Sequence, residues 1–470
     1  MIKSLSEAEV ADQLEQLERQ FGLWSLRVDG FSPWRILRFA VGLELQNLPF
    51  KSNELPRGEL IKACARSFLD LIRPQRSCRY AVKSFSSALR VRTEAGFEDS
   101  YYEALLQKTP GGVRLHSFNA TGYDRRPLAW HGPNIDTTLI VVAGALMGRI
   151  LPIKCGDQVF ETIAIAIRSR MGEGRFPAAR VRRMFSSFWW QAKFYRWLLK
   201  CLSVKTVFVA DTGERALLKA ARENGCQFVE LQHGIFTPNH PDALPCASGL
   251  SADDHGLLLP DIVAAYGSHW ADAHSHRLLG VCSRIRPMGA SFIEQLRAQR
   301  SYVDCEDGVV RLLVTTQGLA RAALISLLKE FLDSCLIPLR LDIKLHPVYD
   351  PVPGHYIEAL GSDRRVNVIS GSAESNTHSL LINCNLHLSI SSACHYDALG
   401  LQVPTAVLAL PNHELVLDLV VAGQAILIQT GSQLAKVVAE KSWISVSPEV
   451  SERYYSAGFT KNLSEWISLE

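Results

Sequence analysis

The sequence predicts an α/β protein with two Rossmann-like, doubly wound domains, and three observations lead to this prediction. From Val204 onward, short apolar and β-branched runs alternate with helical patterns, which is typical of parallel sheets. A charged stretch between Met288 and Asp307 interrupts the alternation, which then starts again. The chain has 470 residues, too many for a single hydrophobic core.

The expected elements follow from this pattern in chain order. Residues 1 to about 110 are expected to be mostly helical, with a helix start just before Trp34, and Thr137–Ala143 reads as a buried strand. Later strands are expected at 205–210, 226–231, 261–265, 309–315, 339–345, 366–369, 386–390, 405–408 and 425–429. Helices are expected at 212–224, 319–332, 375–382 and 395–399. We therefore expect an N-terminal domain at 1–300, with a helical extension, and a C-terminal domain at 301–470.

Composition limits the classes of function. Hydrophobic residues make up 47% of the chain and charged residues 21%, as in ordinary soluble domains. The net charge of +3 gives no support to a nucleic-acid partner. The 11 cysteines form no C-x-x-C pair, which indicates reduced thiols rather than a disulfide framework or a zinc site. The longest apolar run, 139–147, is too short to span a membrane, and no signal peptide is visible. We therefore expect a cytoplasmic protein.

Two basic stretches each have two interpretations. Arg180–Lys200 combines cations and aromatic side chains in a helical pattern. Such a helix can lie on an anionic membrane surface, or it can be a core helix whose long cations reach solvent. The helix that begins near Trp34 and Arg35 is either a packing helix or an arginine-bearing wall of a substrate cleft.

Polar residues follow two strands of the first regular series. Gln232, His233 and Gly234 come directly after the strand at 226–231, and glycine permits a sharp turn there. Ligands of open α/β sheets lie outside the carboxyl ends of strands, so these residues are candidates for substrate binding, with His233 as a proton acceptor. Asp211 closes the preceding strand. It is either a catalytic carboxylate or a helix cap with Glu214 as its capping-box partner.

Polar residues also follow two strands of the second series. Lys344 and His346 end one strand, and Pro347 restricts His346 to extended conformations, so that its imidazole is presented in a fixed direction to a phosphate oxygen. Ser391 and Ser392 precede a helix, where they either cap that helix or bind a phosphate.

The remaining candidates concern the nucleotide and metal ions. Asp397 is placed either to accept hydrogen bonds from a ribose or to pair with a basic side chain at the surface. Gln317 is a candidate for substrate binding, in the loop where a CDP-linked donor would need room for its second phosphate. Asp253-Asp254-His255 reads as a polar loop, and no D-x-D motif is present, so we expect a metal-independent protein without a cofactor. The glycine-rich loops of dehydrogenases and P-loop enzymes are absent.

Three ordered motifs together carry a family resemblance. Leu-Gln232-His233-Gly234, Lys344-Leu-His346-Pro347 and Ser391-Ser392, the last followed by Asp397-Ala-Leu-Gly and Val-Pro, resemble motifs of the GT-B glycosyltransferases of bacterial capsule and lipopolysaccharide synthesis. Among these the Kdo transferases are the most similar. Their relatives include CDP-glycerol glycerophosphotransferases and bacterial sialyltransferases. The resemblance covers roughly residues 204 to 410.

The resemblance implies two domains that face each other across a cleft, a CMP-activated sugar as donor and a growing glycan or glycolipid as acceptor. It implies peripheral contact with the inner membrane. In such enzymes the histidine of the His-Pro pair and the two serines contact the nucleotide phosphate, which gives His346, Ser391 and Ser392 that role. Asp211 would be a base in an inverting enzyme and a nucleophile in a retaining one. Two alternatives stay open: a transferase with a CDP-linked donor, and a non-catalytic subunit that binds glycan or nucleotide.

Overall fold

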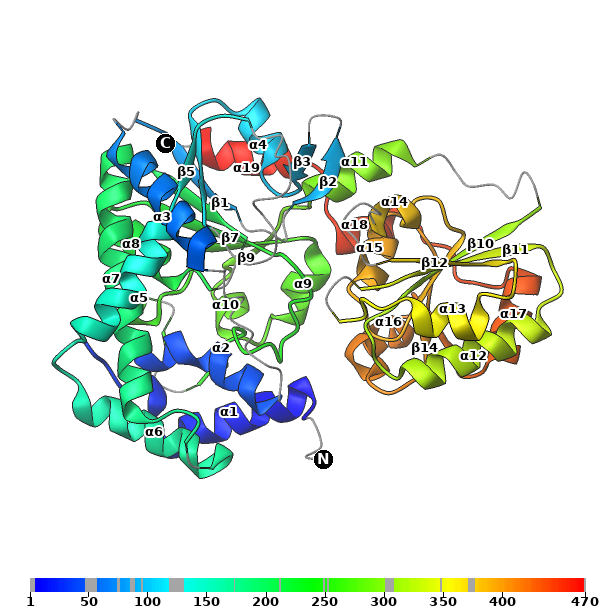
Figure 1. Ribbon diagram of the computed structural model, residues 1–470, viewed down its shortest axis with the longest axis horizontal. Helices are drawn as coiled ribbons and strands as arrows, with labels where there is room; N and C mark the ends of the chain where they lie inside the picture. The colour runs from blue at the N-terminus through cyan, green and yellow to red at the C-terminus, as the bar shows by residue number, and fades with distance from the viewer. Residues whose placement is uncertain are drawn as a thin grey trace. The chain divides into compact units, whose positions relative to one another are not determined.

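The structure is a computed structural model and describes most of the chain. The described residues are 5–46, 57–73, 77–84, 89–93, 96–117, 131–172, 174–210, 213–247, 250–251, 253–300, 308–346, 349–370 and 377–468. Two predicted site residues, Asp211 and Pro347, lie outside these ranges. The chain divides into two compact units, of which unit 1 comprises Met1–Leu89, Thr93–Met288 and Thr460–Glu470, and unit 2 comprises Arg90–Arg92 and Gly289–Phe459. Each unit contains a parallel sheet (Figure 1).

Unit 1 begins with helices. They are α1 (Glu7–Phe21), η1 (Leu23–Ser25), α2 (Pro33–Leu45) and α3 (Arg57–Ile72), and the later helices α5 (Thr138–Ile150), α6 (Asp157–Met171) and α7 (Ala178–Leu202) pack with them. A capping box of Ser6 and Glu9 starts α1. Ser32 caps α2, with Pro33 in the first turn, which confirms the helix start predicted before Trp34.

The sheet of unit 1 has seven parallel strands. They are β1 (Tyr80–Ser84), β4 (Gly112–His116), β5 (Asn134–Asp136), β6 (Thr206–Val209), β7 (Gln227–Leu231), β8 (Ile262–Ala265) and β9 (Ile285–Pro287), in the spatial order β5-β4-β1-β6-β7-β8-β9. A separate two-stranded sheet joins β2 (Leu89–Thr93) and β3 (Gly96–Asp99). Shorter helices are α4 (Glu103–Lys108), α8 (Arg215–Glu223), η4 (His255–Leu257), α9 (Ser268–Ala273) and α10 (Leu278–Val281). Successive strands are added to the sheet on one side of β1 and then on the other, which is the strand order of a doubly wound fold.

One prediction for unit 1 is wrong. Thr137–Ala143 does not form a strand, because the run belongs to helix α5. An uninterrupted apolar run has no periodicity that separates a buried helix from a buried strand. Gly144 and Gly148 bring α5 close to α7: a Cβ atom on Gly148 would lie 2.6 Å from the backbone nitrogen of Ser187. The prediction that residues 1 to about 110 are mostly helical is confirmed for the described residues, since α1, η1, α2, α3 and α4 contain most of them, although the short strands β1, β2 and β3 also lie there.

The helix predicted over Arg180–Lys200 is α7, the longest helix of unit 1 among the described residues. Phe185, Phe188 and Tyr195 are buried, whereas Trp197 is half exposed. Figure 1 shows α3, α5, α7 and α8 gathered along one side of the sheet, and α7 packs on both α5 and α8. The core-helix interpretation therefore describes the greater part of α7.

Unit 2 has a parallel sheet of six strands. They are β10 (Val310–Thr315), β11 (Leu339–Lys344), β12 (Val366–Ile369), β13 (Leu386–Ser389), β14 (Thr405–Leu408) and β15 (Ile426–Ile428), in the order β12-β11-β10-β13-β14-β15. This is the strand order 3-2-1-4-5-6 of a Rossmann fold. A core made mostly of leucine, isoleucine and valine side chains covers one face of the sheet, since it takes alternate residues of the strands, such as Val310, Leu312 and Val314 of β10. All six strands were predicted from the sequence.

The helices of unit 2 complete the α/β pattern. They are α11 (Ser291–Gln299), α12 (Arg321–Ser334), α13 (Gly354–Leu360), α14 (Thr377–Leu381), α15 (Cys394–Gly400), η5 (His413–Val416), α16 (Leu417–Val421), α17 (Gly431–Glu440) and α18 (Pro448–Tyr454). The last helix, α19 (Phe459–Ser468), returns to unit 1, where Asn462 Nδ2 donates to the Met288 oxygen at 3.1 Å. The division between units falls at Gly289, and α11 belongs to unit 2 because Arg297 Nε donates to the Gly400 oxygen at 3.0 Å. The predicted α/β fold with two Rossmann-like domains is confirmed.

Candidate functional site

The strand order of unit 2 changes direction between β10 and β13. Chain connections leave these two neighbouring strands toward opposite sides, and ligands of open α/β sheets bind at such a point, outside the carboxyl ends of the strands. Gln317 follows β10 and Ser391 follows β13, and Ser391 Oγ donates to Gln317 Oε1 at 3.2 Å. Beneath them, Ser389 Oγ donates to the Thr315 carbonyl oxygen at 2.7 Å. The structure thus brings two predicted site residues together at the switch point.

Ser392 forms the turn that leads into α15. Its hydroxyl oxygen accepts a hydrogen bond from the Cys394 nitrogen at 3.2 Å, and its carbonyl oxygen accepts one from the His395 nitrogen at 3.1 Å. The N-cap residue of α15 is Ala393, without a side-chain cap hydrogen bond, so Ser392 forms a turn just before the helix and is not its N-cap residue. The phosphate-binding role of Ser392 stays a prediction.

Lys344 ends β11 and lies opposite Thr315 in the register of the sheet. Its side chain is buried, and its ammonium donates to the carbonyl oxygens of Ser370 at 2.7 Å and Leu345 at 3.4 Å. Burial lowers the pKa of Lys344, and the nearby Cys394 thiol partly opposes this change. The structure therefore places a buried positive charge next to the end of β10.

His346 follows two residues later and is half buried. Its Nδ1 atom accepts a hydrogen bond from the Tyr349 backbone nitrogen at 3.1 Å, so the neutral ring carries its proton on Nε2. Burial lowers the pKa of His346, and the Lys344 charge lowers it further. At neutral pH the ring is thus an uncharged imidazole with an N–H donor at Nε2.

Asp350 connects the loops that follow β10 and β11, and the sequence did not reveal it. Its buried carboxylate accepts hydrogen bonds from Thr316 Oγ1 at 2.7 Å, Tyr356 OH at 2.8 Å and Arg321 Nη2 at 2.7 Å. Thr316 follows β10, whereas Asp350 follows the segment with Lys344 and His346. Asp350 therefore fixes the two loops that carry candidate nucleotide ligands. The sequence signal was weak, because nothing in a loop aspartate indicates burial.

Asp397 is buried in α15, and both of its oxygens have partners. His378 Nε2 lies 3.0 Å from Oδ2, and the Tyr455 hydroxyl donates to Oδ1. The carboxylate thus joins α14, α15 and the segment after α18. Of the two interpretations from the sequence, the structure shows pairing with a neighbouring side chain. The ribose-binding role stays a prediction.

A chain of buried polar side chains lies below the switch point, and the sequence reasoning missed it. His387 Nε2 lies 2.9 Å from Thr315 Oγ1, and His387 Nδ1 lies 2.9 Å from Thr405 Oγ1. His395 Nδ1 lies 2.7 Å from the same threonine oxygen. Burial lowers the pKa of His395 to about 3 and lowers that of His387 as well, so both rings stay neutral.

In unit 1, Gln232, His233 and Gly234 lie directly after β7, as predicted. Gln232 Oε1 accepts a hydrogen bond from the Tyr266 nitrogen at 2.9 Å, and its Nε2 donates to the Gly234 oxygen at 2.8 Å. The Tyr101 hydroxyl donates to the His233 carbonyl oxygen at 3.0 Å. Gln232 thus holds the turn against the end of β8 and sets the position of the half-buried His233. The substrate roles of these residues stay predictions.

The catalytic assignment of Asp211 also stays a prediction, because this residue lies outside the described ranges. The following helix begins at Arg215 rather than at residue 212, so Glu214 precedes the helix and is not its capping-box partner. Glu214 Oε1 instead lies 3.7 Å from the buried Lys83 Nζ, which also donates to Thr137 Oγ1 at 2.9 Å. Lys83 belongs to β1, at the switch point of unit 1.

Arg35 belongs to a buried ion cluster. Arg35 Nη1 lies 2.6 Å and Arg215 Nη2 lies 2.8 Å from Asp242 Oδ1. Burial opposes ionisation of Asp242, but the two guanidinium groups hold the pKa of its carboxyl well below the usual range. Of the two interpretations for the helix near Trp34, the structure shows the packing helix.

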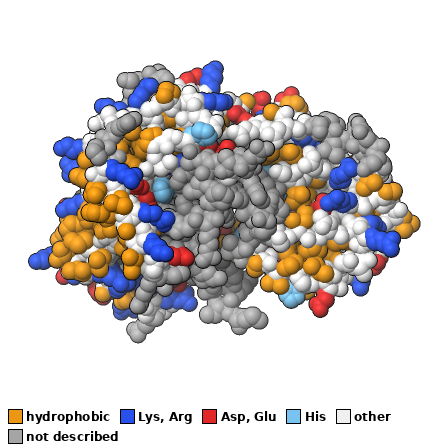
Figure 2. Space-filling model, turned by 45° about the horizontal axis from the view of Figure 1, so that its top comes forward, with side chains coloured by type: hydrophobic (Ala, Val, Ile, Leu, Met, Phe, Trp, Pro, Cys, Tyr) orange, Lys and Arg blue, Asp and Glu red, His pale blue; other side chains and the backbone are white. Residues whose placement is uncertain are grey.

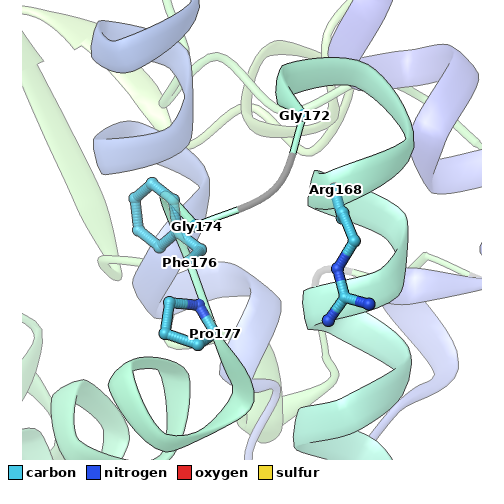
Figure 3. A pocket seen from close by; sticks show the side chains of 5 residues that line it. All are labelled: Arg168, Gly172, Gly174, Phe176 and Pro177. Atoms are coloured by element: carbon cyan, nitrogen blue, oxygen red, sulfur yellow. The ribbon is translucent and has the colours of Figure 1, made fainter.

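Other features of the described residues show no further chemistry. Within the described ranges, no group of three or more His, Cys, Asp and Glu side chains could hold a metal ion. The loop at 253–255 is polar, since Asp254 pairs with Arg27 and caps η4. None of the helices in the described part of the chain is long and apolar enough to cross a membrane. Figure 3 shows a hollow of unit 1 that contains no predicted site residue and is lined by Arg168, Gly172, Gly174, Phe176 and Pro177.

The chain is similar to known proteins in fold only. The chain matches no protein-family model and no curated protein. Among solved structures, UDP-GlcNAc 2-epimerase from Methanocaldococcus jannaschii is 13% identical with a TM-score of 0.49, over 84% of this chain and 100% of that chain. The S. aureus MnaA–UDP structure is 12% identical with a TM-score of 0.48, over 84% and 98%. The wall teichoic acid polymerase TagF with CDPG is 10% identical with a TM-score of 0.43, over 88% and 94%. Likeness at this level assigns no function.

Proposed function

We propose that the protein is a GT-B glycosyltransferase that moves a sugar, foremost Kdo, from a CMP-activated donor to a growing surface polysaccharide or glycolipid. The observation that carries the proposal is the group of polar side chains at neighbouring strand ends of unit 2: Gln317, Lys344, His346 and Ser391. They surround the switch point at which open α/β sheets bind ligands. The choice of CMP and Kdo comes from the motif resemblance.

In this proposal the donor phosphate lies at the ends of β10, β11 and β13. The Nε2–H group of His346 and the Ser391 hydroxyl donate hydrogen bonds to its oxygens, which are strong when the acceptor is charged. The buried ammonium of Lys344 adds positive charge where the leaving CMP gains negative charge. Ser392 and Asp397 support the loop from below through their own contacts.

The transfer step needs a nucleophile, a leaving group and a base. A hydroxyl oxygen of the acceptor attacks the anomeric carbon while the bond from that carbon to the phosphate oxygen breaks. The electron pair of that bond leaves with CMP, and the hydroxyl proton passes to a base of unit 1. Asp211 and His233 are the candidates for this base, because both follow neighbouring strands of one parallel sheet. With a lipid-linked acceptor, the enzyme works in the cytoplasm at the membrane surface.

Calorimetry with CMP, CDP and UDP tests the nucleotide site. We expect CMP to bind most tightly, and His346→Ala to weaken its binding about 10- to 100-fold, the range for a hydrogen bond to a charged group. His355→Ala is the matched control, because His355 is an exposed histidine of the same unit. Tighter binding of CDP would replace the donor by a CDP-linked one. If no nucleotide binds, or if both variants bind alike, the proposal is wrong.

Variants of unit 1 separate an enzyme from a non-catalytic subunit. Asp211→Ala and His233→Ala are expected to keep CMP binding and to lose sugar transfer to a glycan acceptor. A binding subunit would tolerate both changes. Measuring transfer and CMP affinity on the same preparations therefore distinguishes the two functions.

A further inference from the structure

Helix α3 exposes an apolar stripe to solvent. Ile61 is 69% exposed, Phe68 52% and Ile72 58%, and the spacing of seven and four residues places them on one side of the helix. Large apolar side chains at consecutive turns of an exposed helix face are unusual in a soluble domain and mark an interaction surface.

A basic stripe runs beside the apolar one. Lys62, Arg66 and Arg73 are exposed, and at 3.6 residues per turn they lie together roughly 100–140° around the helix axis from the apolar side chains. The two acidic residues of α3 are Glu59 and Asp70, and neither is fully exposed. Asp70 accepts a hydrogen bond from the Asp136 nitrogen at 3.1 Å inside unit 1, and its Oδ1 atom lies 3.4 Å from Arg73 Nη1. The outward positive charge of this stripe therefore comes mainly from Lys62 and Arg66.

Helix α5 continues this surface, since α3 packs against it. Leu146 is 53% and Ile150 62% exposed, and Arg149 between them is exposed as well. The sequence of α5 contains no acidic residue. Figure 1 shows α3 beside α5 on the outer side of unit 1. On the face of unit 1 that Figure 2 shows, hydrophobic side chains lie next to Lys and Arg side chains.

We propose that the exposed sides of α3 and α5 dock on an anionic lipid surface. Apolar side chains at such a surface enter the boundary between headgroups and acyl chains, and flanking cations are attracted to anionic headgroups. The proposal thus moves membrane contact from the stretch 180–200 to α3 and α5, and it does not rest on the proposed donor or acceptor.

Charge favours lipid over a second copy of the chain. A two-fold dimer through this surface would be self-complementary, so Lys62, Arg66 and Arg149 would face cations of the same surface on the other copy. Like charges that face each other oppose association. An anionic membrane supplies the opposite charge at every position of the surface and needs no complementary shape.

Flotation of the full-length protein with vesicles tests this proposal. Vesicles of phosphatidylcholine alone are compared with vesicles that contain about one third anionic phosphatidylglycerol, a lipid that attracts basic segments. Two double variants each remove one component: Phe68→Ser with Ile72→Ser removes apolar contact, and Lys62→Gln with Arg66→Gln removes charge. We expect binding to the anionic vesicles only, and about a tenfold weaker partition coefficient for each double variant.

The control replaces equally exposed apolar residues elsewhere. Leu336→Ser with Val421→Ser changes side chains of unit 2 that are 93% and 83% exposed, and vesicle binding is expected to be unchanged. Circular dichroism and urea unfolding of all variants show that folding is retained. Absence of binding to anionic vesicles, or equal binding by all three double variants, would overturn the proposal. Self-association without lipid that the α3 variants abolish would overturn it in favour of a second copy.

Discussion

Replacing Asp350 by asparagine is expected to destabilise unit 2. One carboxylate oxygen accepts hydrogen bonds from Thr316 and Tyr356, and the other accepts from Arg321. An asparagine amide keeps one acceptor and turns the other into a donor. Either the guanidinium of Arg321 loses its partner, or two buried hydroxyls face an N–H group. Because Arg321 is 33% exposed, solvent replaces part of its lost contact, and we expect a loss of about 1–3 kcal/mol of the free energy of unfolding, the cost of leaving a buried polar group without its partner.

Urea unfolding measures this loss, and Asp363→Asn is the matched control. Asp363 pairs with Arg365 at 2.5 Å near the surface of the same unit, and solvent screening limits such a pair to less than about 1 kcal/mol. In native buffer, Asp350→Asn is also expected to weaken CMP binding about tenfold, because the loop with His346 loses its link to the loop after β10. Equal losses of stability in the two variants would refute the role of buried charge. Unchanged CMP affinity would refute the link to the nucleotide site.

Three further predictions concern stability and charge. The free energy of unfolding is expected to fall as the pH drops below about 6.5, because the folded pKa of His395 is about 3 and the unfolded chain therefore takes up the proton first. This loss is about 1.4 kcal/mol per pH unit, and His395→Gln should flatten the pH dependence of urea unfolding by that slope. Gly148→Ala is expected to cost about 1–3 kcal/mol through overpacking against α7, whereas Gly58→Ala, which meets no atom within 4 Å, should stabilise α3 by up to about 1 kcal/mol in the same assay. Lys344→Met is expected to weaken CMP binding about tenfold by calorimetry and to reduce its salt dependence, because one charge-assisted contact is lost.

The sequence predicts the strands of unit 2 well because their pattern has one interpretation. The strands Val366–Ile369 and Thr405–Leu408 match their predicted bounds. Short runs of β-branched and apolar residues between turn residues are too short for a helix and too apolar for a loop. A parallel sheet that is buried on both faces needs such runs.

Unit 1 was harder to predict because its local signals conflict. The strands β1 and β2 include the cations Lys83, Arg90 and Arg92, so they lack the continuous apolar runs that identify the strands of unit 2. Helix α5 is a continuous apolar run, and its helical signal lies in Gly144 and Gly148, four residues apart on the side that contacts α7. Tertiary packing, rather than local preference, decides both cases.

The candidate site, too, could be predicted only in part from local sequence signals. Sequence locates a polar residue after a strand, which placed Gln232, His346 and Ser391 correctly. It does not locate their partners, since those come from distant parts of the chain: Asp397 is held by a histidine 19 residues and a tyrosine 58 residues away. Asp350 could not be predicted as a buried residue for the same reason, because its partner Thr316 is 34 residues away.

Each unit has a buried lysine near the carboxyl end of a parallel strand, Lys83 of β1 and Lys344 of β11, and the two lysines have different electrostatic surroundings. Lys83 of unit 1 lies 3.7 Å from the carboxylate of Glu214, which offsets its charge. Lys344 of unit 2 is held by the carbonyl oxygens of Ser370 and Leu345, which solvate the ammonium without cancelling its charge. A strand edge that keeps a positive charge suits a phosphate, whereas an edge with a compensated charge suits a neutral hydroxyl compound. This contrast supports a division of labour in which unit 2 binds the nucleotide donor and unit 1 binds the sugar acceptor.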